Sequence, residues 1–159
     1  MNLRIGMGYD VHALQEDLPL ILGGVKIPFP RGLEGYSDAD VLLHAIMDAL
    51  LGAAALGDIG KLFPAGDSRY KGISSLVLLH KVAILLSEAD FEVNNLDSVI
   101  VAENPKLSPY VEIMRSNIGE ALGIEKDLVS VKATTTERLG FTGREEGIAA
   151  YAIAMLRKK

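Results

Sequence analysis

The sequence contains no cysteine, and this absence excludes disulfide bonds and every metal site built on thiolates. A metal such as zinc would have to be held by histidine, aspartate or glutamate. Positive charge is also scarce, because 16 lysines and arginines against 21 aspartates and glutamates leave a net charge of −5. This balance argues against broad nucleic-acid binding, which normally needs a basic face. Phosphates are still admissible ligands, since a metal and local donors can reverse the field within a site.

Long apolar runs are missing as well. His80 and Lys81 interrupt the most hydrophobic stretch, so no segment is predicted to span a membrane. Residues 1–6 lack the apolar run of a signal peptide, and we therefore expect a cytoplasmic protein with no membrane partner. The 159 residues, 49% hydrophobic and 23% charged, fit a single domain over 1–159 with a substantial buried core.

The hydrophobic periodicity predicts an α+β domain, a small mixed β-sheet with helices packed on one face. The expected strands are 3–13, 20–27 with a bulge or bend at Gly23-Gly24, 97–103 and 128–133. The expected helices are 38–57, capped by Ser37, then 74–89 and 108–123. The segment 147–156 fits either a helix or a strand by its pattern alone.

The first candidate metal ligands are Asp10 and His12. Side chains two residues apart on a strand share one face, so the carboxylate and the imidazole project together. The alternative is a strand with a polar solvent-facing side, because this short pattern is common by chance.

His44 adds a third candidate ligand at the margin of the apolar face of the first helix. Asp40 and Asp48 flank it at i−4 and i+4, and we expect these carboxylates to fix the orientation of its imidazole. Two histidines and one aspartate leave a fourth position open, which is typical of a catalytic zinc site. The alternative is an amphipathic helix with a solvated polar stripe. His80 has no partner motif and is interpreted as a surface or packing residue.

Two further segments are suited to phosphate. In the stretch 134–144, the three consecutive hydroxyls of 134–136 occur with two glycines and two arginines, and Glu137 is the type of oxygen ligand that Mg²⁺ takes beside substrate phosphates. Taken alone, it also fits a threonine-rich turn. The stretch 102–107 is a strand end that breaks into a turn with Lys106, and by itself it is only a loop. The long loop 58–67 is of a length that is often functional.

Together these motifs resemble the 2-C-methyl-D-erythritol 2,4-cyclodiphosphate synthases, the ring-closing enzymes of the non-mevalonate isoprenoid pathway. The resemblance extends from Arg4 to Ala149. Its most specific stretches are GYDVH at 8–12, SDADVLLH at 37–44, LGDIGKLFP at 56–64, KATTTE at 132–137 and GFTGR at 140–144.

The resemblance implies intramolecular phosphoryl transfer, in which the 2-phosphate of a cytidine diphosphate derivative of methylerythritol attacks the β-phosphorus and expels CMP. It implies zinc on Asp10, His12 and His44, and Mg²⁺ or Mn²⁺ on Glu137. Thr135 matches the threonine that stabilises the transition state, and Tyr36 stands where the family commonly has a histidine of similar role.

The resemblance also implies the residues that bind the substrate. Those expected around the methylerythritol group are Tyr36, Ser37, Asp58, Ile59, Gly60, Phe63, Pro64, Ala65, Gly66 and Asp67. Those expected around the cytidine and its phosphates are Ala102, Glu103, Asn104, Pro105, Lys106, Leu107, Ser108, Thr134, Thr135, Thr136 and Glu137. Ala65 departs from the family pattern, which often has an acidic residue there, so Asp67 is the carboxylate left in the diol pocket.

The family is homotrimeric with active sites between neighbouring subunits, and its C-terminal segment is a strand near the threefold axis. This favours a strand over 147–156. Phe141, Arg144 and Glu146 match residues around a central cavity that holds an isoprenoid diphosphate in some members.

Two other functions fit parts of the pattern. A metal-dependent phosphohydrolase would use metal-bound water on a nucleotide diphosphate. A non-catalytic trimeric sensor would bind a prenyl diphosphate through Arg144, but it would have no use for the Asp10, His12 and His44 set.

Overall fold

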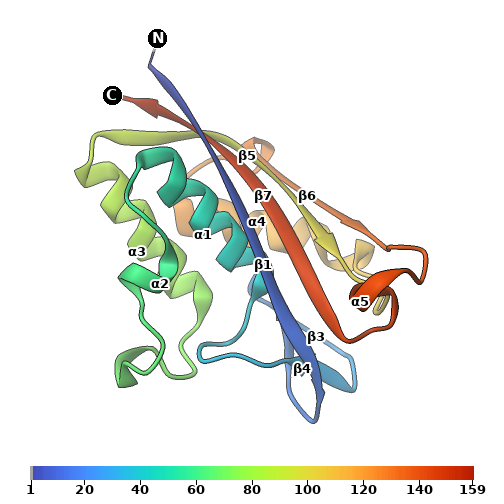
Figure 1. Ribbon diagram of the computed structural model, residues 1–159. Coiled ribbons are helices and arrows are strands. Elements are labelled where there is room, and N and C mark those ends of the chain that lie inside the picture. The colour runs from blue at the N-terminus through green and yellow to red at the C-terminus, as the bar shows by residue number, and fades with distance from the viewer. Residues whose placement is uncertain (1) are drawn as a thin grey trace.

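A computed structural model describes residues 2–159, and its centre is a five-stranded mixed sheet with the order β4-β1-β7-β5-β6. The strands are β1 Leu3–Glu16, β4 Arg31–Leu33, β5 Phe91–Val101, β6 Val129–Thr134 and β7 Gly147–Lys158. Within this sheet β5 and β6 are parallel, and the other neighbouring pairs are antiparallel. In Figure 1 the long strands β1 and β7 run side by side across the molecule.

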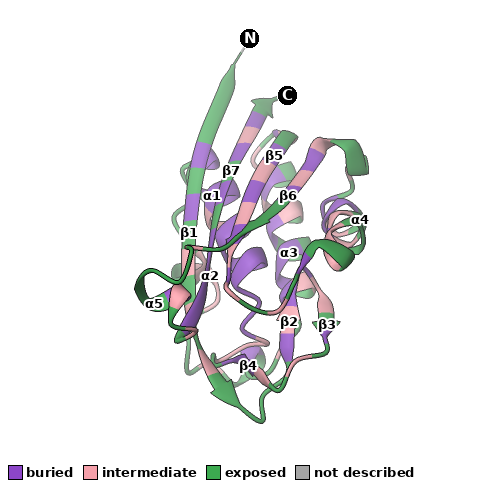
Figure 2. Cartoon of the chain, turned by 90° about the vertical axis from the view of Figure 1, so that its right-hand side faces the viewer, coloured by how far each residue is buried: buried purple, intermediate pink, exposed green. Residues whose placement is uncertain are grey.

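Three long helices pack on one face of the sheet (Figures 1 and 2). They are α1 Val41–Ala54, α3 Ser75–Glu88 and α4 Val111–Leu122. Helix α1 lies directly against β1 and β7, and nearly all of its residues are buried. The predicted α+β class with a mixed sheet is confirmed. No helix among residues 2–159 is long and apolar enough to cross a membrane.

Glycines in β1 allow this close contact between the strand and α1. A Cβ atom on Gly8 would lie 1.9 Å from the carbonyl oxygen of Ala45, and one on Gly6 would lie 2.0 Å from that of Ala49. Real Cβ atoms do not approach backbone oxygens so closely, so only glycine fits at either position. The Gly8 contact brings α1 down onto the part of β1 that continues into Asp10 and His12.

The segment predicted as one strand over 20–27 is two short strands, and that prediction is wrong. Strands β2 Leu20–Leu22 and β3 Val25–Ile27 form a separate hairpin. Gly23 and Gly24 between them have φ values of +57° and +72°, which match the left-handed conformations of a tight hairpin turn. The predicted bend is therefore in the right place, but it reverses the chain.

The first helix begins at Val41 with Asp40 as its N-cap, so Ser37 is not the cap. The Asp40 carboxylate accepts a hydrogen bond of 3.1 Å from the Leu43 N–H, and it also accepts from Gly23 and Gly24 of the hairpin turn. The helix ends at Ala54, followed by the left-handed cap residue Ala55, before the predicted end at 57.

The other boundaries lie within about three residues of the predicted ones, except for the start of β5. Helix α3 matches its predicted range within one residue at each end, and 147–158 is the strand that the resemblance favours. Strand β5 begins at Phe91, six residues before the predicted start, because polar residues and a bulge near Asn95 mask its alternation. Short helices complete the chain: α2 Ile59–Leu62, α5 Gly140–Gly143, and the 3₁₀ turns Ser68–Tyr70, Ser108–Tyr110 and Lys126–Leu128.

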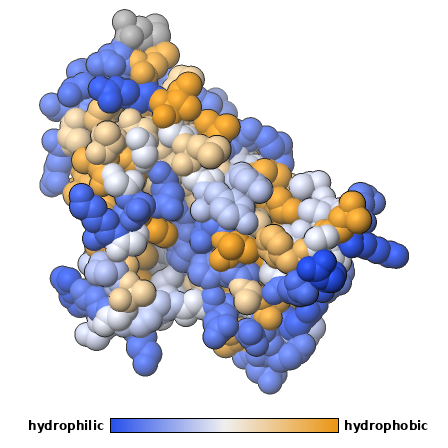
Figure 3. Space-filling model, viewed as in Figure 1, coloured by the Kyte–Doolittle hydropathy of each residue, from blue (hydrophilic) through white to orange (hydrophobic). Residues whose placement is uncertain are grey.

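The sheet face opposite the long helices is open and apolar. Large exposed side chains project from it on β1 and β7, and they are Ile5, Met7, Tyr9, Val11, Tyr151 and Ile153. Figure 3 shows apolar surface over the upper part of these two strands. The rings of Tyr9 and Tyr151 are 4.8 Å apart between centroids, so this face already has a packed aromatic pair.

Candidate active site

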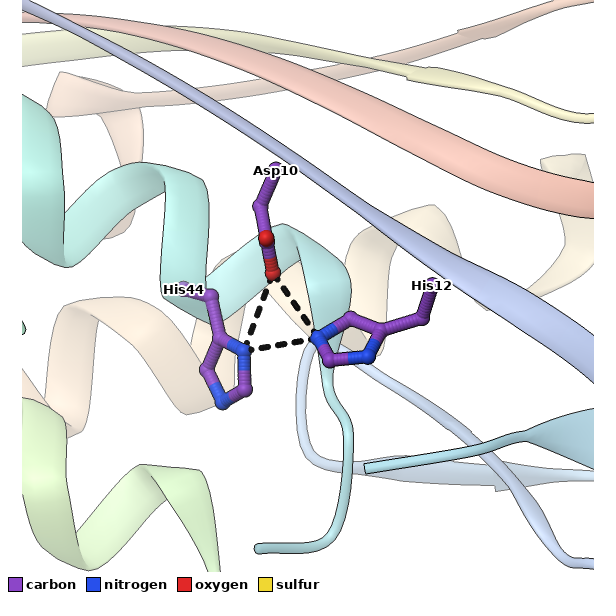
Figure 4. A group of neighbouring side chains, drawn as sticks. All are labelled: Asp10, His12 and His44. Carbon is purple, nitrogen blue, oxygen red and sulfur yellow. Dashed lines mark hydrogen bonds and ion pairs between the residues drawn. The ribbon is translucent and has the colours of Figure 1, made fainter. Parts of the chain in front are cut away.

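The three candidate ligands Asp10, His12 and His44 meet in one cluster (Figure 4). Asp10 and His12 point from β1 toward α1, as the alternation of a strand requires, and His44 points from α1 toward them. Asp10 Oδ2 lies 3.0 Å from His12 Nε2 and 3.0 Å from His44 Nδ1, and the two imidazole nitrogens are 3.1 Å apart. One atom from each residue therefore faces a common centre.

Groups outside the cluster hold both imidazole rings. His12 Nδ1 lies 2.6 Å from the backbone carbonyl of Glu34 and can only donate to it, which leaves Nε2 free to face the centre. His44 Nε2 lies 3.1 Å from Ser37 Oγ and 3.0 Å from Ser75 Oγ. Glu34 acts through its backbone and Ser75 begins another helix, so the sequence pattern singled out neither.

The prediction that Asp40 and Asp48 orient His44 is wrong. Asp40 is completely buried and its oxygens accept from backbone N–H groups of the hairpin turn and of α1. Burial raises the pKa of Asp40 to about 6. Asp48 Oδ1 instead accepts a hydrogen bond of 2.8 Å from the Ile59 N–H. His44 itself is only 8% exposed, less than its predicted place at a helix margin indicates.

The electrostatics of the cluster favour a charged carboxylate. Burial opposes ionisation of Asp10, but the imidazoles of His12 and His44 beside it hold the pKa of the Asp10 carboxyl well below its usual range. Burial also opposes protonation of His12, yet the hydrogen bond to Asp10 raises the pKa of His12 above its ordinary value.

The donor set fits a divalent metal. The ligand atoms of Asp10, His12 and His44 all lie within 4.8 Å of one another, with two imidazole nitrogens and one carboxylate oxygen. Three protein ligands and an open position form the usual arrangement of a catalytic zinc site, and His44 and His12 each keep a hydrogen-bond partner on the opposite ring nitrogen.

A cavity of about 250 Å³ opens beside the cluster, and we call it the small cavity. Its walls are His12, Tyr36, Ser37, His44, Ile59, Gly60, Phe63, Ala65, Tyr70 and Leu78. Six of the residues predicted around the methylerythritol group are among them. Asp58, Pro64, Gly66 and Asp67 are not: Asp58 caps α2, and Asp67 caps the following 3₁₀ turn and pairs with Arg69.

Tyr70 and Leu78 line the small cavity without having been predicted. The Tyr70 ring packs edge-on against Phe63 with centroids 5.4 Å apart, and Leu78 belongs to the core face of α3. Both have the ordinary pattern of core residues, so the sequence offers no signal that they also border a cavity.

A second cavity, of about 360 Å³, lies at the ends of β5 and β6 and is called the large cavity. It is lined by Ala102, Glu103, Asn104, Pro105, Lys106, Leu107, Ser108, Ala133, Thr134 and Thr135. This wall contains the whole segment 102–108 that was predicted to hold the cytidine. Of the predicted residues 134–137 at the end of β6 and just after it, Thr134 and Thr135 line this cavity, whereas Thr136 and Glu137 do not.

Glu137 lies in the exposed turn after β6, apart from the metal cluster. Its φ is +52°, and its backbone N–H and carboxylate are both bonded to the Thr135 hydroxyl, at 3.2 and 3.3 Å. Phe141 lies in the short helix α5, and Arg144 after it forms an exposed pair with Glu146 at 3.0 Å. The predicted role of Glu137 in a second metal site stays a prediction.

The loop of the large cavity is tied to the start of β7. Asn104 Nδ2 donates a 2.8 Å hydrogen bond to Glu145 Oε1, and the other oxygen of Glu145 is paired with Arg31 of β4. His80 lies outside the walls of both cavities. It is exposed on α3 and bonds only the Ala121 carbonyl among described groups, which confirms its interpretation as a surface residue.

The two cavities share no residue. The register of the sheet places Asp10, Ala150, Ile100 and Ala133 in one row. Asp10 and Ala133 are thus three strand spacings apart, roughly 14 Å along a flat sheet. Within one chain, the metal cluster and the large cavity therefore form separate parts of the site.

Known proteins are similar to this chain over nearly its whole length. A protein from Pelotomaculum thermopropionicum is 61% identical over 98% of this chain and 96% of its own, and one from Dehalococcoides mccartyi is 60% identical over 99% and 100%. Both are named 2-C-methyl-D-erythritol 2,4-cyclodiphosphate synthase.

Solved structures agree in fold. A Plasmodium falciparum structure, described as IspF in complex with CDP, has a TM-score of 0.87 at 34% identity and covers 99% of this chain and 97% of its own. A bifunctional Campylobacter jejuni protein has a TM-score of 0.95 at 43% identity, and this chain spans 43% of its length. The sequence profile of the YgbB family matches residues 3–157, and the chain belongs to that family.

Proposed function

We propose that this protein is a cyclodiphosphate synthase that converts 4-diphosphocytidyl-2-C-methyl-D-erythritol 2-phosphate to 2-C-methyl-D-erythritol 2,4-cyclodiphosphate and CMP, in the non-mevalonate isoprenoid pathway. Relatives that bear this name are about 60% identical over nearly the whole chain. The observation that carries the proposal is the convergence of Asp10, His12 and His44 beside the small cavity.

The reaction makes and breaks one bond at the same phosphorus. An oxygen of the 2-phosphate bonds to the β-phosphorus, the anhydride bond between the α- and β-phosphates breaks, and CMP leaves with the bridging oxygen. Because both reacting groups belong to one molecule, the protein has to fold the substrate into a ring and neutralise its charge. Asp10, His12 and His44 would hold the zinc, which would supply positive charge to polarise the diphosphate.

The two cavities fit the two ends of such a substrate. The small cavity, with its mostly apolar walls and the Ser37 hydroxyl, suits the compact methylerythritol group. The large cavity suits the cytidine, and Lys106 in its wall suits the attached phosphates. The presence of CDP in the Plasmodium falciparum relative supports a cytidine diphosphate ligand.

Tyr36 and Thr135 are the proposed groups that stabilise the transition state. Tyr36 lines the small cavity and Thr135 the large one. A tyrosine in place of a histidine donates through its hydroxyl and stays neutral near pH 7, so its contribution is a hydrogen bond without charge.

Glu137 is the proposed ligand of a second cation, Mg²⁺ or Mn²⁺. Support for this role comes from its exposure and from its hydrogen bond with Thr135, a residue that lines the large cavity. Glu137→Gln should keep the zinc but lower turnover about 10-fold or more at ordinary Mg²⁺ concentration, because it removes a charged oxygen ligand without changing the shape. Titration of activity with Mg²⁺ measures this. An unchanged Mg²⁺ dependence would place the second metal elsewhere.

The open apolar face supports assembly into a homotrimer with sites shared between subunits. Side chains such as Ile5, Met7 and Ile153 are more than half exposed in the single chain, and a subunit interface would cover them. The separation of the two cavities within one chain is also consistent with a site completed by a neighbour. Phe141, Arg144 and Glu146 would then surround a central cavity able to take an isoprenoid diphosphate. An active monomer in light scattering would contradict the trimer. The cytoplasmic location stays a prediction.

Incubation of the purified protein with the cytidylyl substrate and Mg²⁺ tests the function. We expect equal amounts of CMP and one cyclic diphosphate, visible by ³¹P NMR as two coupled ring phosphorus signals. A metal-dependent phosphohydrolase would give an open-chain phosphate product instead. A non-catalytic sensor would bind ligand and release no CMP.

A further inference from the structure

We propose that Asp38 and Ser75 position the imidazole of His44 for metal binding, through a hydrogen-bonded chain that runs from the carboxylate through the serine hydroxyl to the ring. This inference rests on the proposed metal site at Asp10, His12 and His44. The sequence had suggested Asp40 and Asp48 for this positioning role. The inference assigns the role instead to Asp38, which lies before α1, and to Ser75, the first residue of α3.

The hydrogen bonds fix the direction of this chain. Ser75 Oγ donates to Asp38 Oδ1 at 2.5 Å and lies 3.0 Å from His44 Nε2. A hydroxyl has one proton to donate, so toward His44 the oxygen of Ser75 can only accept. Nε2 must then carry the ring proton, and the lone pair of Nδ1 points toward Asp10 and His12. This is the tautomer that a metal at the cluster requires.

The buried surroundings make the chain rigid. Ser75 is completely buried, and its backbone N–H donates to the other oxygen of Asp38 at 2.9 Å. Asp38 also accepts from the Asp40 N–H at 3.2 Å. The carboxylate thus receives three hydrogen bonds and holds Ser75 through both its hydroxyl and its backbone N–H.

Ser37 also approaches His44 Nε2, at 3.1 Å, but its setting is different. It lines the small cavity and is partly exposed, and its other hydrogen bond is a long one of 3.3 Å from the Ala39 N–H. Ser37 is therefore available to a ligand in the cavity, whereas Ser75 is committed to Asp38 and His44.

Backbone hydrogen bonds beside Asp38 also anchor the loop that forms the wall of the small cavity. Asp38 N donates to the Ile73 carbonyl at 3.0 Å, and Gly72 N donates to the Tyr36 carbonyl at 2.8 Å. The segment before α1 and the segment before α3 are therefore fastened together at several points. One set of hydrogen bonds therefore determines both the orientation of His44 and the position of the end of the loop 59–73. Loosening this set should weaken metal binding and change the shape of the small cavity together.

Zinc affinity, measured by competition with a chelator, tests the proposal in the full-length protein. Ser75→Ala should weaken zinc binding about 10- to 100-fold, the usual effect of losing an outer partner of a ligating histidine. Asp38→Asn should weaken it in the same direction. Ser74→Ala is the matched control, because Ser74 is exposed and its side chain caps nothing, and its zinc affinity should equal that of the parent.

The tautomer of His44 gives a second readout that needs no metal and no activity. In ¹⁵N NMR spectra of the metal-free parent, we expect His44 to carry its proton on Nε2, and Ser75→Ala should shift it toward a mixture of tautomers. A parent protein with the proton on Nδ1, or a folded Ser75→Ala protein with parental zinc affinity, would overturn the proposal. A parent that binds no metal at all would instead refute the proposed metal site.

Discussion

His44→Ala is expected to abolish tight zinc binding and to reduce CMP formation to background. The substitution removes one of three ligands and leaves a carboxylate and one imidazole to hold the cation. Loss of an outer hydrogen-bond partner already costs about 10- to 100-fold in metal affinity, so loss of the ligand itself should exceed about 100-fold. Elemental analysis of the protein purified without added metal, together with a CMP assay, measures both effects.

His80→Ala is the control for the loss of a histidine as such. His80 is exposed on α3 and bonds a backbone carbonyl of α4, so its removal should leave zinc content and turnover unchanged. Because His44 is buried, its variant should also be checked for folding by circular dichroism. A folded His44→Ala protein that retains stoichiometric zinc and full activity would contradict the assigned site.

Gly8→Ala is expected to destabilise the fold strongly. The new Cβ would lie 1.9 Å from the Ala45 carbonyl oxygen and 2.8 Å from the Ala49 nitrogen, both backbone atoms of α1. Since these atoms cannot swing away as a side chain can, β1 and α1 have to separate. We expect a loss of about 3 kcal/mol or more in the free energy of unfolding, and a melting temperature lower by about 6–12 °C.

Gly52→Ala is the matched control within α1. A Cβ on Gly52 meets nothing within 4 Å, and alanine is favoured over glycine in a helix by about 1 kcal/mol. This variant should therefore be as stable as the parent or more stable. Thermal unfolding of the two variants side by side provides the measurement, and a Gly8→Ala protein as stable as Gly52→Ala would refute the close packing of β1 on α1.

The sequence predicted that Asp10 and His12 lie together because this depends on a local rule. Asp10 and His12 share a face through the alternation of a strand, and this holds wherever the strand packs. His44 lies on the helix that β1 packs against, but no periodicity indicates that pairing. The resemblance to a known family supplied it, and the glycine contacts of Gly8 explain it physically.

The errors also have physical causes. Asp40 and Asp48 were expected to bond His44 because they are neighbours on a helix, but each is engaged by backbone N–H groups from another part of the chain. Such long-range donors leave no trace in the local pattern. The same is true of Ser75, which contacts His44 only because α3 begins beside Asp38.

The origin of the oxygen atoms in the products tests the proposed ring closure most directly. The reaction should be run to completion in water enriched in ¹⁸O, and the CMP and the methylerythritol product analysed by mass spectrometry. Ring closure uses an oxygen of the substrate's own 2-phosphate as the nucleophile, so neither product should contain solvent oxygen. One ¹⁸O atom in the phosphate of either product, at the level of the solvent, would show that water is the nucleophile and would contradict a cyclodiphosphate synthase.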